Sequence, residues 1–119
     1  MARVKRGVTK HQRHHSTLAL TKGHRGVRHR LYKRAKESLI KAMAYTYAHR
    51  RERKGDFRRL WILRIGAAAR QDGLTYNGFM HGLKLAQVEV DRKVLSDIAV
   101  RDPQGFSQLA AVARQHLGS

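Results

Sequence analysis

Cations and histidines are the residues of this chain whose types and spacing could do chemistry. Lys and Arg number 26 against 8 Asp and Glu among 119 residues, which gives a formal net charge of +18. The 8 histidines could bind a metal, because His11 and His14 could share one face of a helix. However, the chain has no cysteine, and no carboxylate lies near these histidines. We therefore predict no metal site, and we expect the histidines to supplement Arg and Lys in contacts with phosphates or bases.

The motifs that accompany catalysis or nucleotide cofactors are missing from the sequence. It contains no P-loop, no G-x-G-x-x-G turn, no nucleophile elbow and no paired carboxylates in an apolar setting. Gly78 and Gly82 lie within an amphipathic stretch, where glycine favours the close approach of another helix or backbone. We predict that the protein is not an enzyme and that it takes no cofactor and no small-molecule substrate.

The cations are concentrated in the first half of the chain. Residues 1–59 hold 19 Lys and Arg against 3 acids, a net charge of +16, whereas residues 60–119 hold 7 against 5, a net charge of +2. Such asymmetry is typical of a nucleic-acid-binding extension on a globular domain. Because Arg outnumbers Lys in the basic half, bidentate contacts with phosphate are favoured.

The elements that carry these cations follow from the apolar pattern. Residues 1–26 hold few apolar residues, so we expect them to be disordered in the free protein, with one or two helical turns around residues 9–20. From residue 27 to about residue 71 the pattern predicts a helix, about 65–70 Å long, with a bend at Gly55. Its narrow apolar stripe consists of Tyr32, Ala35, Leu39, Met43 and Tyr47.

Residues 60–119 have the pattern of a small helical domain. Thr75, Asp91 and Asp102 are predicted N-caps of three short helices. We expect Trp61 to be largely buried at the start of the core stripe. In the helix that Asp91 caps, we expect the side chains that face the core to be those of Val94, Leu95, Ile98 and Ala99. The sequence thus predicts an all-α fold with a long basic N-terminal helical extension, residues 1–59, and a small C-terminal helical globular domain, residues 60–119.

The arrangement of the cations favours structured RNA as the partner. Over residues 27–59 they lie on several faces of the predicted helix, which suits burial among several nucleic-acid helices, as folded RNA offers. Tyr45 and Tyr47 could stack on unpaired bases, whereas we expect Tyr32 and Phe57 to pack within the protein. The predicted RNA-binding residues are Arg3, Lys5, Arg6, Lys10, Arg13, His14, His15, Lys22, Arg25, Arg28, Arg30, Lys33, Arg34, Lys36, Lys41, Arg50, Arg51, Arg53, Lys54, Arg58 and Arg59.

Two other classes of basic protein compete with this interpretation. One is a DNA-binding or nucleoid-type protein, although residues 87–91 lack the glycine of a typical helix-turn-helix linker. The other is a membrane-active amphipathic helix, which the narrow apolar stripe disfavours because it offers little area to insert. No apolar run approaches the length of a membrane span, so we expect an intracellular, soluble protein without a membrane partner.

Several specific motifs resemble one known family over essentially the whole chain. They are ARVKRG (2–7), KGHRGVRHRLYKRAKESLIKA (22–42), RRERKGDFRRLWILRIGAAAR (50–70) and LTYNGFMHGLKLAQVEVDRKVLSDIAVRDPQGF (74–106). Within them, DFRRLWI (56–62) and DRKVLSDIA (91–99) are the most specific. The family that they resemble is the bacterial and organellar large-subunit ribosomal protein numbered twenty.

The resemblance implies direct binding to 23S ribosomal RNA, a role early in assembly of the large (50S) subunit, and a cytoplasmic location in the ribosome. It also implies contact with the neighbouring large-subunit proteins twenty-one and thirteen, no catalysis, and in some members binding to their own messenger. Three residues depart from the family pattern: Gly66 replaces a common asparagine, Gly55 a basic residue and His24 an aromatic residue. We expect the two glycines to weaken the helix locally.

Overall fold

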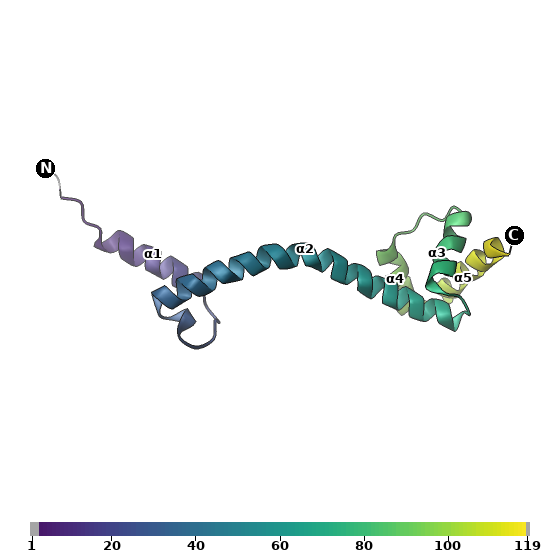
Figure 1. Cartoon of the computed structure of the whole chain (residues 1–119), viewed down its shortest axis with the longest axis horizontal. Coiled ribbons are helices and arrows are strands. Elements are labelled where there is room, and N and C mark those ends of the chain that lie inside the picture. Colours follow the sequence, from purple (N-terminus) through teal and green to yellow (C-terminus); the bar gives the residue numbers. More distant parts are fainter. Residues whose placement is uncertain (1–2, 119) are drawn as a thin grey trace. The chain divides into compact units, whose positions relative to one another are not determined.

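The computed structural model describes residues 3–118, and these residues form helices without any strand (Figure 1). The elements are α1 (Gly7–Leu20), the 3₁₀ turn η1 (Gly26–His29), α2 (Tyr32–Gln71), α3 (Tyr76–Leu85), α4 (Arg92–Arg101) and α5 (Pro103–Leu117). The predicted all-α fold is therefore confirmed. The described residues fall into two compact units that divide within α2, between Arg51 and Glu52. The functional boundary after residue 59 concerns binding and stays a prediction.

In the first unit, α1 is longer than the one or two turns that the sequence predicts, but none of its residues is buried. The turn that follows is ordered by Thr21, which is fully buried and whose hydroxyl donates to the carbonyl oxygen of Leu18 at 3.1 Å. Gly23 and Gly26 then adopt positive φ angles of 86° and 69°, a conformation that glycine takes at low cost. The disorder predicted for residues 1–26 in the free protein stays a prediction, and residues 1–2 lie outside the described range.

Helix α2 begins at Tyr32 rather than at residue 27, so its predicted start is wrong. The intervening residues form η1, and the backbone leaves helical geometry at Arg30, which has φ −127° and ψ −34°. The first α-helical hydrogen bond therefore runs from Ala35 N–H to Leu31 O, at 2.8 Å. From there α2 continues without interruption through Gly55 and Gly66 to Gln71.

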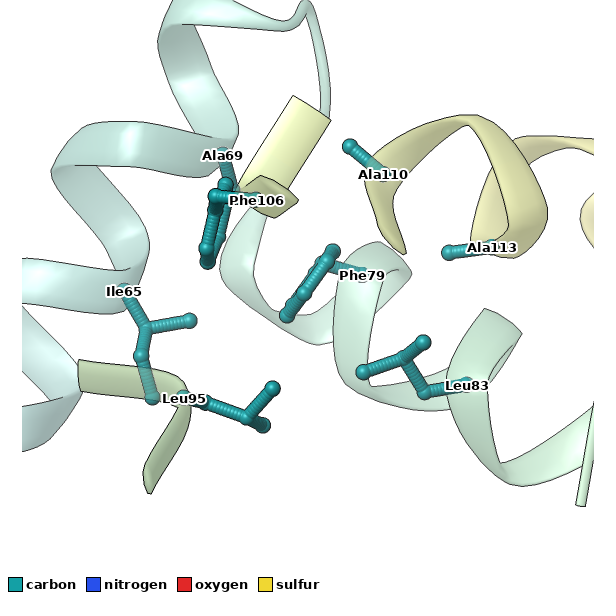
Figure 2. Close-up of a cluster of buried hydrophobic side chains, with 8 residues drawn as sticks. All are labelled: Ile65, Ala69, Phe79, Leu83, Leu95, Phe106, Ala110 and Ala113. Atoms are coloured by element: carbon teal, nitrogen blue, oxygen red, sulfur yellow. The ribbon is translucent and has the colours of Figure 1, made fainter. Parts of the chain in front are cut away.

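The core of the second unit is built from the last turns of α2 together with α3, α4 and α5. Phe79 of α3 stacks on Phe106 of α5 with ring centroids 4.8 Å apart, and Ile65 and Ala69 of α2 close the cluster (Figure 2). Its eight buried members are Ile65, Ala69, Phe79, Leu83, Leu95, Phe106, Ala110 and Ala113. The second unit therefore has a continuous apolar core of its own.

The signals that begin and separate the short helices act as the sequence predicts. Each predicted N-cap oxygen accepts a hydrogen bond from the backbone N–H three residues later, at 3.1 Å for Thr75, 2.8 Å for Asp91 and 3.0 Å for Asp102. Gly82 permits the close approach predicted for it, because a Cβ atom there would lie 2.8 Å from the backbone Cα of Ala113 in α5.

One prediction about the core is wrong, and Trp61 lies at the edge of the core. Trp61 is partly buried and its ring contacts Phe57, at 6.3 Å between centroids, whereas the fully buried stripe begins one turn later at Ile65. In α4, Val94 is 46% exposed whereas Ser96 is buried. At about 100° per residue, Val94 and Ser96 lie on opposite sides of Leu95, and the helix turns the Ser96 side toward the core.

Candidate nucleic-acid interface

The predicted RNA-binding residues lie in the segment before α1, in α1, in the turns around η1 and along α2 as far as Arg59. All of them are exposed except His14, which is half-buried. The ring of His14 stacks on Tyr32 with centroids 3.7 Å apart, so these two residues pack α1 against the start of α2. The expected packing of Tyr32 is thus confirmed, whereas His14 is partly engaged inside the protein.

Most of these cations have no acidic partner. In residues 3–118 the predicted set forms two ion pairs, Arg34 with Glu37 at 3.2 Å and Arg59 with Asp56 at 3.7 Å. The side chains of both pairs are more than half exposed, and such pairs contribute little because water and salt screen them. The positive charge of the first half is therefore not neutralised within the described part of the chain.

The cations between residues 50 and 59 surround much of α2. At about 100° per residue they cover an arc of roughly 240°, and Glu52 and Asp56 occupy the sector that remains. The cations in this arc are Arg53, Arg50, Lys54, Arg58, Arg51 and Arg59. Every residue from 51 to 59 is exposed, and Phe57 is 47% exposed although its ring contacts Trp61, so the packing expected for Phe57 is found only in part. Such a surface can contact phosphates on more than one side.

The two tyrosines predicted to stack on bases are exposed beside cations. Tyr47 is 65% exposed, and the guanidinium carbon of Arg51 lies 4.5 Å from its ring centroid. Tyr45 is 51% exposed and stacks on His49 at 5.5 Å between centroids, and the ammonium nitrogen of Lys41 lies 5.9 Å from the centroid of the Tyr45 ring. Both rings therefore present a π surface next to positive charge, which is the combination that binds unpaired bases.

The structure contains no arrangement suited to metal binding within residues 3–118, where no group of three His, Cys, Asp or Glu residues comes together. Several histidines instead make internal contacts. His24 Nδ1 forms a 2.7 Å hydrogen bond with the hydroxyl of Ser38, and His29 Nδ1 lies 3.0 Å from the carbonyl oxygen of His24. These contacts hold the η1 turn beside α2.

Sequence reasoning missed a groove that forms between this turn and α2. One wall comes from residues 24–28 and the other from residues 34–45 of α2. The three- to four-residue spacing of Ser38, Lys41 and Tyr45 indicates that they share one face of the helix, so the sequence could have predicted the α2 wall of the groove. The opposite wall depends on how Gly23 and Gly26 turn the chain, which the spacing does not encode.

None of the helices within residues 3–118 combines the length and the apolar character that a membrane span requires.

The chain matches the family model for ribosomal protein L20 over residues 3–109. It is also similar to three proteins named large ribosomal subunit protein bL20. The protein from Moorella thermoacetica is 57% identical over 118 residues, 99% of this chain and 98% of the relative. The protein from Thermomicrobium roseum is 60% identical over 117 residues, 98% and 100% of the two chains.

The third relative, from Dehalococcoides mccartyi, is 58% identical over 113 residues, which make up 95% of each chain. The family-model match and these near full-length relatives agree with the motifs that the sequence carries. Proteins of this family are structural, non-enzymatic components of the large ribosomal subunit, which in bacteria lies in the cytoplasm. The chain belongs to the ribosomal protein L20 family.

Proposed function

We propose that the chain binds 23S ribosomal RNA directly and acts early in assembly of the large subunit. The observation that carries the proposal is the band of exposed cations along α1, the η1 turn and α2 up to Arg59, of which only Arg34 and Arg59 pair with an acid among residues 3–118. Folded RNA brings phosphates to several sides of such a helix, whereas one duplex groove brings them to one side. The early role in assembly rests on the family resemblance.

The mechanism is charge neutralisation coupled to ordering of the basic half. Each phosphate that a Lys or Arg neutralises releases condensed counterions, so affinity grows with the number of contacts and falls with salt. Residues 1–59 carry a net charge of +16 and fill the spaces between RNA helices, while residues 60–119 dock with their core already formed. Large-subunit proteins twenty-one and thirteen are the protein neighbours that the resemblance implies.

A salt titration on 23S ribosomal RNA tests this division. The test variant replaces Arg50, Arg51 and Arg53 with Gln, three exposed cations without an ion pair among the described residues. The matched control replaces three exposed cations of the second unit, Arg64, Arg70 and Lys93, with Gln.

The plot of log affinity against log salt should become shallower by about 2–3 in the test variant, because each phosphate contact contributes about 0.7–0.9 to the slope. The control should change the slope by less. Equal changes in the two variants would mean that residues 1–59 make no more phosphate contacts than residues 60–119. Tighter binding to duplex DNA than to ribosomal RNA at matched salt would favour the DNA-binding class.

A further inference from the structure

The groove in the first unit has the size of a ligand site, and most of the side chains that line it are polar or charged. Its volume is about 820 Å³, inside the range of roughly 300–1,000 Å³ that small-molecule sites show. Two segments line it, the turn that contains His24 and Arg28, and the face of α2 that contains Glu37, Ser38, Lys41 and Tyr45. It lies entirely within the first unit, so its shape is set by contacts inside that unit.

The walls of the groove are held in place by specific contacts. The 2.7 Å hydrogen bond between His24 Nδ1 and the Ser38 hydroxyl ties the turn to α2 at the floor of the groove. Thr21, fully buried, fixes the chain just before the turn. These contacts bring the two walls of the groove together within the first unit.

Tyr45 supplies a flat aromatic surface on the α2 wall. Its ring is half exposed, and stacking on His49 fixes the orientation of the ring before any ligand binds. The ammonium nitrogen of Lys41 lies 5.9 Å from the ring centroid. A base that stacks on Tyr45 is thus within reach of Lys41, whose flexible stem lets the ammonium move from the ring to the edge of the base.

The charges of the groove separate into a neutral pair and two free cations. Glu37 pairs with Arg34 at 3.2 Å, so the single carboxylate of the groove is already compensated. Arg28 and Lys41 have no ion-pair partner among residues 3–118. These two cations can therefore contact a phosphate or an acceptor atom of a base.

The donor character of Lys41 selects among the bases. An ammonium group donates hydrogen bonds and accepts none, so it favours a base edge with two acceptors. Guanine presents N7 and O6 side by side on one edge, and contacts of Lys or Arg with these atoms are the commonest specific contacts to bases. Adenine places an amino group next to N7, where it opposes the ammonium.

We propose that this groove holds one unpaired guanine of the bound RNA. The base stacks on Tyr45, its N7 and O6 accept hydrogen bonds from Lys41, and an adjoining phosphate contacts Arg28. This assignment rests on the proposed function and adds a specific nucleotide site to a surface that otherwise contacts phosphates. It also gives Tyr45 a different role from Tyr47, which lies on the same helix but outside the groove.

Chemical probing of 23S ribosomal RNA, free and bound to the full chain, tests the site. Kethoxal on the free RNA identifies the unpaired guanines, and dimethyl sulfate then reports whether N7 of any of them is protected in the complex. The test variants are Tyr45→Leu and Lys41→Gln. The matched controls are Tyr47→Leu and Lys36→Gln, which change exposed residues of the same helix outside the groove.

We expect one unpaired guanine to be protected at N7 by the wild-type chain and by both controls, and exposed again with both test variants. Affinity for the RNA should fall roughly 5- to 150-fold in Tyr45→Leu, which corresponds to the loss of one stacked base. Tyr45→Phe keeps the ring and should keep the protection. Circular dichroism checks that each variant retains its helix.

Three results would overturn the proposal. One is protection of the same guanine by Tyr45→Leu and by wild type. A second is loss of N7 protection at that guanine in Tyr47→Leu as well as in Tyr45→Leu. A third is protection of an adenine or pyrimidine in its place. Hydroxyl-radical footprinting of the chain on ribosomal RNA distinguishes failure of the guanine site from failure of the proposed RNA binding. A footprint that persists without any Tyr45-dependent guanine removes the nucleotide site only, whereas absence of any footprint removes ribosomal RNA binding itself.

Discussion

Gly82→Ala is the substitution that probes the second unit most directly. A Cβ atom at position 82 would lie 2.8 Å from both Cα and the carbonyl carbon of Ala113, closer than real Cβ atoms approach other atoms. The obstacle is the backbone of α5 and not the end of a flexible side chain. Because a backbone cannot rotate out of the way, α3 and α5 must move apart for the methyl group to fit.

The expected magnitude follows from two opposing effects. Alanine gains about 1 kcal/mol over glycine in a helix interior. Overpacking of a well-packed core costs about 1–3 kcal/mol and occasionally more, and a clash with backbone belongs at the upper end. We therefore expect Gly82→Ala to lower the free energy of unfolding by about 2 kcal/mol, which corresponds to a fall in Tm of about 8–16 °C for a domain of this size.

Urea unfolding of the full chain, followed by the fluorescence of Trp61 in the second unit, measures the effect. Gly66→Ala is a matched control, because Gly66 is also buried in a helix but its Cβ would lie 3.7 Å from Tyr76 Cβ, an ordinary contact. Gly55→Ala is a second control with nothing within 4 Å. Both controls should gain about 0.5–1 kcal/mol. A Gly82→Ala variant as stable as wild type would refute the direct contact between the backbones of α3 and α5.

Three further measurements check other parts of the structure. Asp91→Ala removes the oxygen that accepts from Val94 N–H and should cost about 1 kcal/mol in urea unfolding, whereas an unchanged midpoint would argue against the cap. Ser96→Ala should be neutral or stabilising by up to about 1 kcal/mol, because the buried Ser96 hydroxyl has no hydrogen-bond partner among residues 3–118, and a clear loss of stability would reveal one. Amide exchange of the free protein should show little protection in α1, which has no buried residue, and strong protection there without RNA would contradict the predicted disorder.

The features that the sequence predicts correctly are those that local chemistry decides. The three N-caps depend on one oxygen and a backbone N–H three residues away, so their residue types suffice. The end of α2 at Gln71 is equally local, since Gly73 adopts a φ of 74° that favours glycine. Charge is likewise independent of packing, so the exposed cations of the first half can be identified without a structure.

The features that the sequence misses depend on packing between elements. Trp61 and Ile65 belong to the same apolar stripe, and only the place where α3 to α5 meet α2 decides that the core starts at Ile65. The orientation of α4 also depends on packing: the helix is rotated about its axis so that Ser96, and not Val94, lies in the interior. The groove beside Tyr45 forms because the η1 turn lies along α2, and the spacing of apolar residues in the sequence does not predict this arrangement.

The two units differ in what holds their helices together, and this difference bears on how binding and ordering are coupled. The second unit buries a cluster of eight apolar residues, whereas the buried residues described in the first are Thr21 and Ala35. The first unit also carries the larger share of cations without acidic partners, and their mutual repulsion opposes a compact arrangement. Removing charges from the first unit should therefore make α1 and the η1 turn more ordered in the free protein while weakening RNA binding. In the second unit, the loss of the same number of charges should leave order unchanged, because the apolar core determines it.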